Sequence, residues 1–256
     1  MKNYKLIKNN SFHFSVDDVF NSLIEISDKK ILLKDHWFFK QLYDLWKNYG
    51  VKTSCNLFLE GIVNDKKRYL QEVRCIKNEI DEGWLFFGPH ALNSSTPPFK
   101  QNKTQQIKTF NDIYKEIDRF AGTKNRCKYI RLHHYSESYQ LSNYWKQNKI
   151  KGLFSTDRSV GSHTMPNYIS KKLINFGNAE YKSTFFIKTD FRVEWLSKIR
   201  KNIQSKILKV FNLKLKKKKF IIIYSHEYEL KKKKNKKVLI KCISLIRKIN
   251  LKSIHP

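Results

Sequence analysis

Short apolar, β-rich stretches alternate with amphipathic segments about six or seven times along this chain of 256 residues. The stretches predicted to be strands are 11–16, 51–59, 84–87, 128–133, 153–156, 182–187 and 220–225. The segments with apolar residues at helical spacing are 35–49, 66–80, 104–120, 138–148, 194–211 and 238–251. This alternation is typical of βαβ units, in which parallel strands lie inside and helices lie outside.

We therefore expect an α/β fold, a distorted (β/α) barrel of about seven strands that ends in a C-terminal basic amphipathic helix. A doubly wound open sheet is the alternative. Residues 1–230 would form the barrel. Residues 231–256 would form the helix, which either packs on the barrel or faces a membrane surface. Residues 157–180 are predicted to be a long loop, and the lysine runs 214–219 and 231–237 to be solvated turns.

The chain begins with a polar, lysine-containing segment that shows no signal-peptide pattern, and its longest apolar run, 220–224, is too short to cross a bilayer. Its four cysteines lie far apart, without metal-ligand or redox spacing. Widely spaced cysteines are typical of the reduced, mostly buried thiols of an intracellular protein. We expect a cytoplasmic protein, with peripheral attachment at the inner face of the membrane as the alternative.

The formal net charge is +30, and lysine makes up nearly all of the excess. The lysine runs lack interleaved aromatic residues for base stacking, and no nucleic-acid motif is present, so no nucleic-acid partner is expected. The simplest interpretation is generally solvated charge. An anionic partner, such as a membrane surface reached through the C-terminal lysines or an acidic glycan, is the alternative.

Ionisable side chains follow five of the predicted strands, and in parallel α/β folds the reacting groups gather at the carboxyl ends of strands. These side chains are Asp17 and Asp18, His90, Arg131 with His133 and His134, Asp157, and His226 with Glu227. Their convergence on one face is the strongest functional signal in the sequence.

Each of these residues also has a purely structural interpretation. The acid pair Asp17–Asp18 could cap a helix, and a single loop histidine such as His90 is often structural. An inward Arg131 needs a carboxylate, for which Asp17 is the best candidate. The polar cluster Asp190, Arg192 and Glu194 is explained by helix capping and a local ion pair.

In motif order, the chain resembles the NodB-like polysaccharide deacetylases, the family 4 carbohydrate esterases, and within them a divergent branch associated with surface-polysaccharide synthesis. Ser15-Val16-Asp17-Asp18-Val19 is similar to the family's first motif, Thr-Phe-Asp-Asp-Gly. His90 matches the first histidine of the second motif, but Ser94 stands where the second histidine is expected. Arg131 matches the arginine of the third motif, and Tyr224-Ser225-His226 keeps the histidine of the last motif.

The resemblance implies that Asp17 is the catalytic base, that Arg131 orients it and that His226 is the acid. It implies Asp18 and His90 as metal ligands. His133 could replace the missing histidine, with Asn93, Ser94 or a water as weaker substitutes. The metal would be zinc, with cobalt, nickel or manganese also admitted by such ligands.

The implied function is metal-dependent removal of an N-acetyl group from an amino sugar of a surface polysaccharide or its precursor. Asp157, His134 and Asn93 are candidate substrate-binding residues. Two alternatives remain: a degenerate member that binds sugars or partners without catalysis, and a basic peripheral membrane-binding module.

Overall fold

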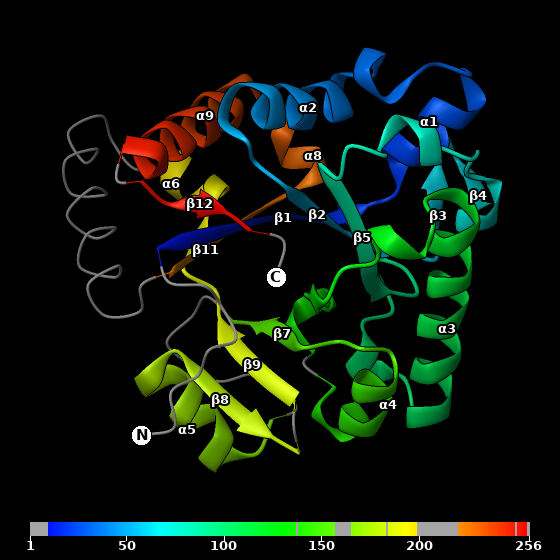
Figure 1. Cartoon of the computed structure of the whole chain (residues 1–256). Coiled ribbons are helices and arrows are strands. Elements are labelled where there is room, and N and C mark those ends of the chain that lie inside the picture. The colour runs from blue at the N-terminus through cyan, green and yellow to red at the C-terminus, as the bar shows by residue number, and fades with distance from the viewer. Residues whose placement is uncertain are drawn as a thin grey trace.

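The computed structural model describes residues 10–136, 138–156, 165–182, 184–198, 220–248 and 250–254. Its centre is a parallel sheet with the strand order β10-β11-β1-β2-β5, and β12 also pairs with β1 (Figure 1). These strands are β1 (Ser11–Val19), β2 (Thr53–Phe58), β5 (Leu85–Ala91), β10 (Phe191–Arg192), β11 (Phe220–His226) and β12 (Lys252–Ser253). Both faces of β1, β2 and β5 are covered, as expected for parallel strands inside an α/β fold.

A second sheet has the order β6-β7-β9-β8. Its strands are β6 (Tyr129–Ile130), β7 (Gly152–Ser155), β8 (Asn178–Tyr181) and β9 (Thr184–Lys188), of which only β8 is antiparallel to its neighbour. A parallel bridge from Phe87 to Arg126 connects the two sheets on one side. On the other side the chain runs from β9 through Thr189 and Asp190 into β10. The predicted parallel α/β architecture is confirmed, although no continuous strand ladder closes the barrel within the described ranges.

The helices are α1 (Asn21–Asp28), α2 (Trp37–Tyr49), α3 (Lys103–Phe120), α4 (Ser142–Gln147), α5 (Asn167–Phe176), α6 (Val193–Lys198), α8 (Glu227–Leu230) and α9 (Lys233–Lys248). Local sequence accounts for the boundaries of the longest ones. Gly50 ends α2 at φ +67°, a conformation that favours glycine. Asn102 and Gln105 form a capping box at the start of α3.

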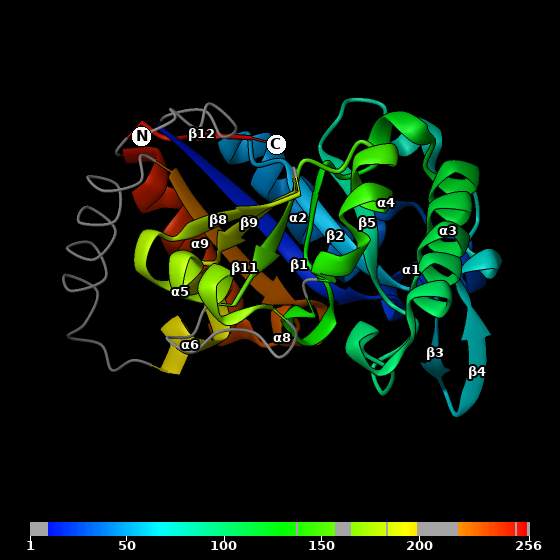
Figure 2. The ribbon, with the colours of Figure 1, turned by 90° about the horizontal axis from the view of Figure 1, so that it is seen from below.

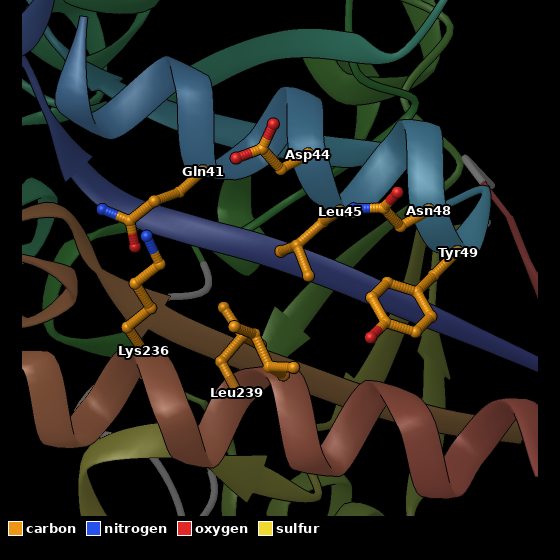
Figure 3. A pocket seen from close by; sticks show the side chains of 8 residues that line it. Gln41, Asp44, Leu45, Asn48, Tyr49, Lys236 and Leu239 are labelled. Atoms are coloured by element: carbon orange, nitrogen blue, oxygen red, sulfur yellow. The ribbon is translucent and has the colours of Figure 1, made fainter.

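The C-terminal helix α9 lies beside α2 and α6 (Figure 1). Its apolar residues Leu239, Cys242, Ile243 and Ile246 are buried there. A cavity of 170 Å³ remains between α2 and α9, lined in part by Asp44, Tyr49 and Lys236 (Figure 3). No described helix combines the length and the apolar character needed to cross a membrane.

Three predicted segments differ from the structure. The helix predicted at 66–80 is wrong: β3 (Glu60–Val63) and β4 (Lys66–Tyr69) form a hairpin there, followed by short 3₁₀ turns. Asn64 and Asp65, at φ +50° and +61°, make a tight turn whose backbone suits a two-residue hairpin. Figure 2 shows this hairpin extending away from the rest of the protein.

The loop predicted at 157–180 is wrong over its second half, where α5 and β8 lie, and residues 157–164 are outside the described ranges. The lysine run 231–237 is not only a turn, because α9 begins at Lys233. The helix predicted at 194–211 is described only to Lys198, where α6 ends, and the run 214–219 lies outside the described residues.

Candidate active site

Two acids stand at the carboxyl end of β1, the central strand. Asp17 is in register with His226 at the end of β11. Asp18 has φ +60°, and the pairing of β1 with β2 shifts register between Val16 and Val19. A bulge of this kind redirects side chains at the end of a strand. The adjacent carboxylates therefore have different partners.

Asp17 is buried and held by two donors. Its Oδ1 accepts a hydrogen bond of 2.8 Å from Asn56 Nδ2. Arg131 Nη1 lies 3.2 Å from Oδ1 and 3.4 Å from Oδ2. Arg131 is itself only 1% exposed and also donates to the hydroxyls of Ser15 and Thr189. The guanidinium thus has several acceptors around it, and it fixes the position of the carboxylate.

Asp18, His90 and His133 converge beside this pair. Oδ1 of Asp18 lies 3.1 Å from Nε2 of His90 and 3.3 Å from Nδ1 of His133. The two ring nitrogens are 3.1 Å apart. Burial alone would raise the pKa of the Asp18 carboxyl, but the two imidazoles beside it outweigh that effect and hold the pKa well below its usual range.

The far nitrogen of each imidazole faces a backbone carbonyl. Nδ1 of His90 lies 2.6 Å from the carbonyl oxygen of Arg131, and Nε2 of His133 lies 3.0 Å from that of Ser94. Because a carbonyl oxygen can only accept, each of these nitrogens carries its proton. When the imidazoles are neutral, each inward nitrogen is unprotonated and turns its lone pair toward the same point as Oδ1 of Asp18, which is the arrangement that metal-ligating histidines adopt. When they are protonated, these nitrogens donate to Asp18 instead, and in that state they lower its pKa.

The spacing of these three atoms also fits a cation. Ligands about 2.0–2.1 Å from a tetrahedral ion lie about 3.3 Å from one another, and the three separations are 3.1, 3.1 and 3.3 Å. Three lone-pair atoms repel at such distances unless a shared proton or a cation lies between them. The triad of two imidazoles and one carboxylate is the donor set that zinc and similar divalent ions prefer.

His226 is held by a carboxylate from a different element. Oε1 of Glu194, in α6, lies 3.2 Å from Nδ1 of His226. The same oxygen accepts from the His226 backbone N–H at 2.8 Å and from Ser225 Oγ at 2.7 Å. Burial lowers the pKa of the imidazole, but the Glu194 hydrogen bond and the charges of Asp17 and Asp18 outweigh it, so the pKa is raised. His226 is therefore suited to donate a proton.

The three candidate substrate-binding residues lie in different surroundings. His134, at φ +53°, is exposed, and its ring meets that of Phe99 edge-on with centroids 6.3 Å apart. The Asn93 side chain donates to Glu60 and accepts from the backbone of its own turn. Asp157 lies outside the described residues.

Two residues of the site were not found from the sequence. Asn56 lies inside the apolar strand β2 and carries no motif, so nothing in the sequence marks it. Glu194 was interpreted as a helix cap, but it binds His226 because β10, just before it, pairs with β11. Glu227, the residue after His226, accepts from the backbone N–H groups of Phe20 and Ser22 at the start of α1.

No protein-family model matches the chain, and no curated protein matches its sequence. Solved structures do match. A protein from Mycobacterium smegmatis that has been assigned as a polysaccharide deacetylase aligns over 96% of this chain and 93% of its own, with a TM-score of 0.51 and 6% identity. The 4-α-glucanotransferase of Thermococcus litoralis aligns over 95% of this chain and 37% of its own, with a TM-score of 0.56 and 12% identity. The Bc1960 peptidoglycan N-acetylglucosamine deacetylase aligns over 96% and 86%, with a TM-score of 0.49 and 14% identity.

At these identities the likeness concerns the fold. The chain has the NodB-like α/β fold of the polysaccharide deacetylases, so the predicted resemblance is confirmed at that level.

Proposed function

We propose that this protein is a metal-dependent hydrolase that removes an N-acetyl group from an amino sugar of a surface polysaccharide or its precursor. The observation that carries the proposal is the meeting of three sets of groups at one strand end. Asp17, held by Arg131, is adjacent in the chain to Asp18 of the triad and in register with His226. A base, a metal site and an acid are the groups that amide hydrolysis requires.

Asp18, His90 and His133 would hold the divalent ion, for which zinc is the first choice and cobalt, nickel or manganese are alternatives. When bound, such an ion polarises a carbonyl and lowers the pKa of a water molecule. His133 takes the place of the histidine that the chain lacks at Ser94. The Ser94 carbonyl nevertheless contributes, because it orients the His133 ring.

The reaction would add water to the acetyl carbonyl and break its C–N bond. Asp17 would accept the proton of the attacking water, since Asn56 and Arg131 keep its carboxylate in one orientation. His226 would give a proton to the departing nitrogen, which is otherwise a poor leaving group, and Glu194 favours its protonated form. The products are acetate and a free amino sugar.

The test is acetate release from a panel of N-acetylated sugars with zinc or cobalt added. Asp17→Asn is expected to lower kcat at least ~100-fold, as loss of a general base does. Asp35→Asn, at an exposed position on a 3₁₀ turn that contributes none of the proposed catalytic or metal-binding groups, is the matched control and should keep full activity. The proposal is wrong if wild-type protein with bound metal releases acetate no faster than Asp17→Asn across the panel.

A further inference from the structure

A row of aromatic rings and one guanidinium in contact with each other includes His226 of the site. The Arg192 guanidinium lies 5.1 Å from the ring centre of Trp195 on one side and 5.1 Å from that of Tyr224 on the other. The Tyr224 and His226 rings are 5.6 Å apart, and His226 and Tyr228 stack with centroids 5.4 Å apart at 28°. The row thus runs from Trp195 to Tyr228, with the proposed proton donor inside it.

The two ends of the row are open to solvent while its middle is not. Tyr228 is 57% exposed and Trp195 is 45% exposed, whereas Tyr224 is 1% exposed. Exposed aromatic surface next to a cluster of buried, charged groups often marks a ligand site.

The Tyr228 side chain also lies close to the reacting groups. One side of its ring packs on His226. Burial raises the pKa of the Tyr228 hydroxyl, and the charges of Asp18, Glu229 and Glu194 raise it further. The hydroxyl is therefore within electrostatic reach of the carboxylate of the triad and of the one that holds His226.

We propose that Tyr228 is a platform on which a pyranose ring of the substrate stacks, with Trp195 supporting a further part of the glycan at the other end of the row. This inference rests on the proposed function and narrows it to substrates that present a sugar ring. A pyranose ring has an apolar C–H face that fits an aromatic face, and hydroxyl groups at its edge that stay in water. Because one face of Tyr228 packs on His226, the sugar ring would stack on the opposite face, and a neighbouring sugar of the glycan would present its N-acetyl group to the site.

The experiment compares the full chain with Tyr228→Ala, Tyr228→Phe and Tyr168→Ala, with zinc added. Tyr168 is the matched control because it is 58% exposed, close to the value for Tyr228. Tyr168 is the second residue of α5. It lies at the opposite end of that helix from Gly177, whose carbonyl accepts from Lys188 at the carboxyl end of β9. The substrates are a β-1,4-linked tetramer of N-acetylglucosamine and ethyl thioacetate, which has an acetyl group but no sugar ring.

Tyr228→Ala is expected to raise the KM for the tetramer about threefold to tenfold, as loss of an aromatic stacking contact does. Tyr228→Phe, which keeps the ring, and Tyr168→Ala should both stay near the wild-type KM. The kcat/KM for ethyl thioacetate should stay near the wild-type value in all variants. The inference is overturned if Tyr228→Ala lowers kcat/KM equally for the tetramer and for ethyl thioacetate, because an equal decrease would show a general effect on His226.

Equilibrium binding distinguishes a failure of the Tyr228 inference from a failure of the proposed function. If wild-type protein releases no acetate, titration calorimetry with the tetramer still tests the platform. Binding that is weakened by Tyr228→Ala and kept by Tyr168→Ala supports the inference. Wild-type protein that does not bind the tetramer, or Tyr228→Ala that binds it as tightly as wild type, overturns it.

Discussion

His133→Ala should abolish tight metal binding, because His133 would supply one of the three ligand atoms that converge among the described residues. Its Nδ1 lies 3.1 Å from Nε2 of His90 and 3.3 Å from Oδ1 of Asp18. Without this imidazole, a divalent ion would keep two protein ligands and would have to take water in place of the third.

The size of the effect follows from linkage. Wild-type protein in zinc at about 100 times its Kd gains about 2.7 kcal/mol in the free energy of unfolding. Loss of a group that only supports a ligand already weakens affinity by up to ~100-fold, so loss of the ligand itself should cost at least that much. At the same zinc concentration His133→Ala would then gain only about 0.4 kcal/mol. The difference of about 2.3 kcal/mol corresponds to roughly 5–9 °C in Tm for a chain of this size.

The assay is a thermal melt with and without zinc, together with metal analysis of the purified protein. His134→Ala is the matched control, since the neighbouring imidazole is exposed and lies outside the triad. It should keep the zinc-dependent rise in Tm and one bound ion per chain. The same rise in His133→Ala as in wild type would refute the assignment of His133 as a ligand.

Three further predictions concern groups around the triad. Glu194→Gln removes the carboxylate that raises the pKa of His226, so the alkaline limb of the kcat/KM profile should move to lower pH; an unmoved limb would contradict the role of Glu194. Arg131→Met leaves Asp17 buried without its cation, and urea unfolding should show a loss of about 3–5 kcal/mol, whereas a loss below about 1 kcal/mol would mean that the pair is not buried as described. Burial raises the pKa of Glu227 to about 7, above that of the unfolded chain, so its contribution to stability is present below pH ~4.5 and is lost as pH rises through 7. Between pH 5 and 8 wild-type protein should therefore lose about 2.5 kcal/mol more than Glu227→Gln in urea titrations, and parallel pH profiles of the two proteins would contradict this contribution of Glu227.

Much of the fold could be predicted from residue patterns because its elements are long and periodic. The helices 35–49 and 104–120 were predicted within two residues of α2 and α3. The apolar stretch 220–225 is nearly all of β11. The segment 66–80 failed because its apolar spacing mimics a helix, while the turn at Asn64 and Asp65 turns the chain back into a hairpin. The short strands β8 and β10 could not be found from local pattern, because four or two residues carry too little periodicity.

The sequence by itself determined the alternation that makes a parallel α/β fold and the order of ionisable groups at the strand ends. Asp17, Asp18, His90, Arg131 and His226 could be proposed because each directly follows or ends an apolar stretch, and parallel strands bring their carboxyl ends to one face. The sequence also showed which of these side chains are acids, histidines or an arginine, and that Ser94 stands where a histidine is expected.

Only the tertiary structure decided how these groups are partnered. The bulge at Asp18 turns that carboxylate toward two imidazoles and leaves Asp17 to Arg131 and Asn56. Glu194 reaches His226 through strand pairing between segments about 30 residues apart. Such contacts depend on register and on distances of a few ångströms between elements distant in the chain, and periodicity along a sequence contains no information about either.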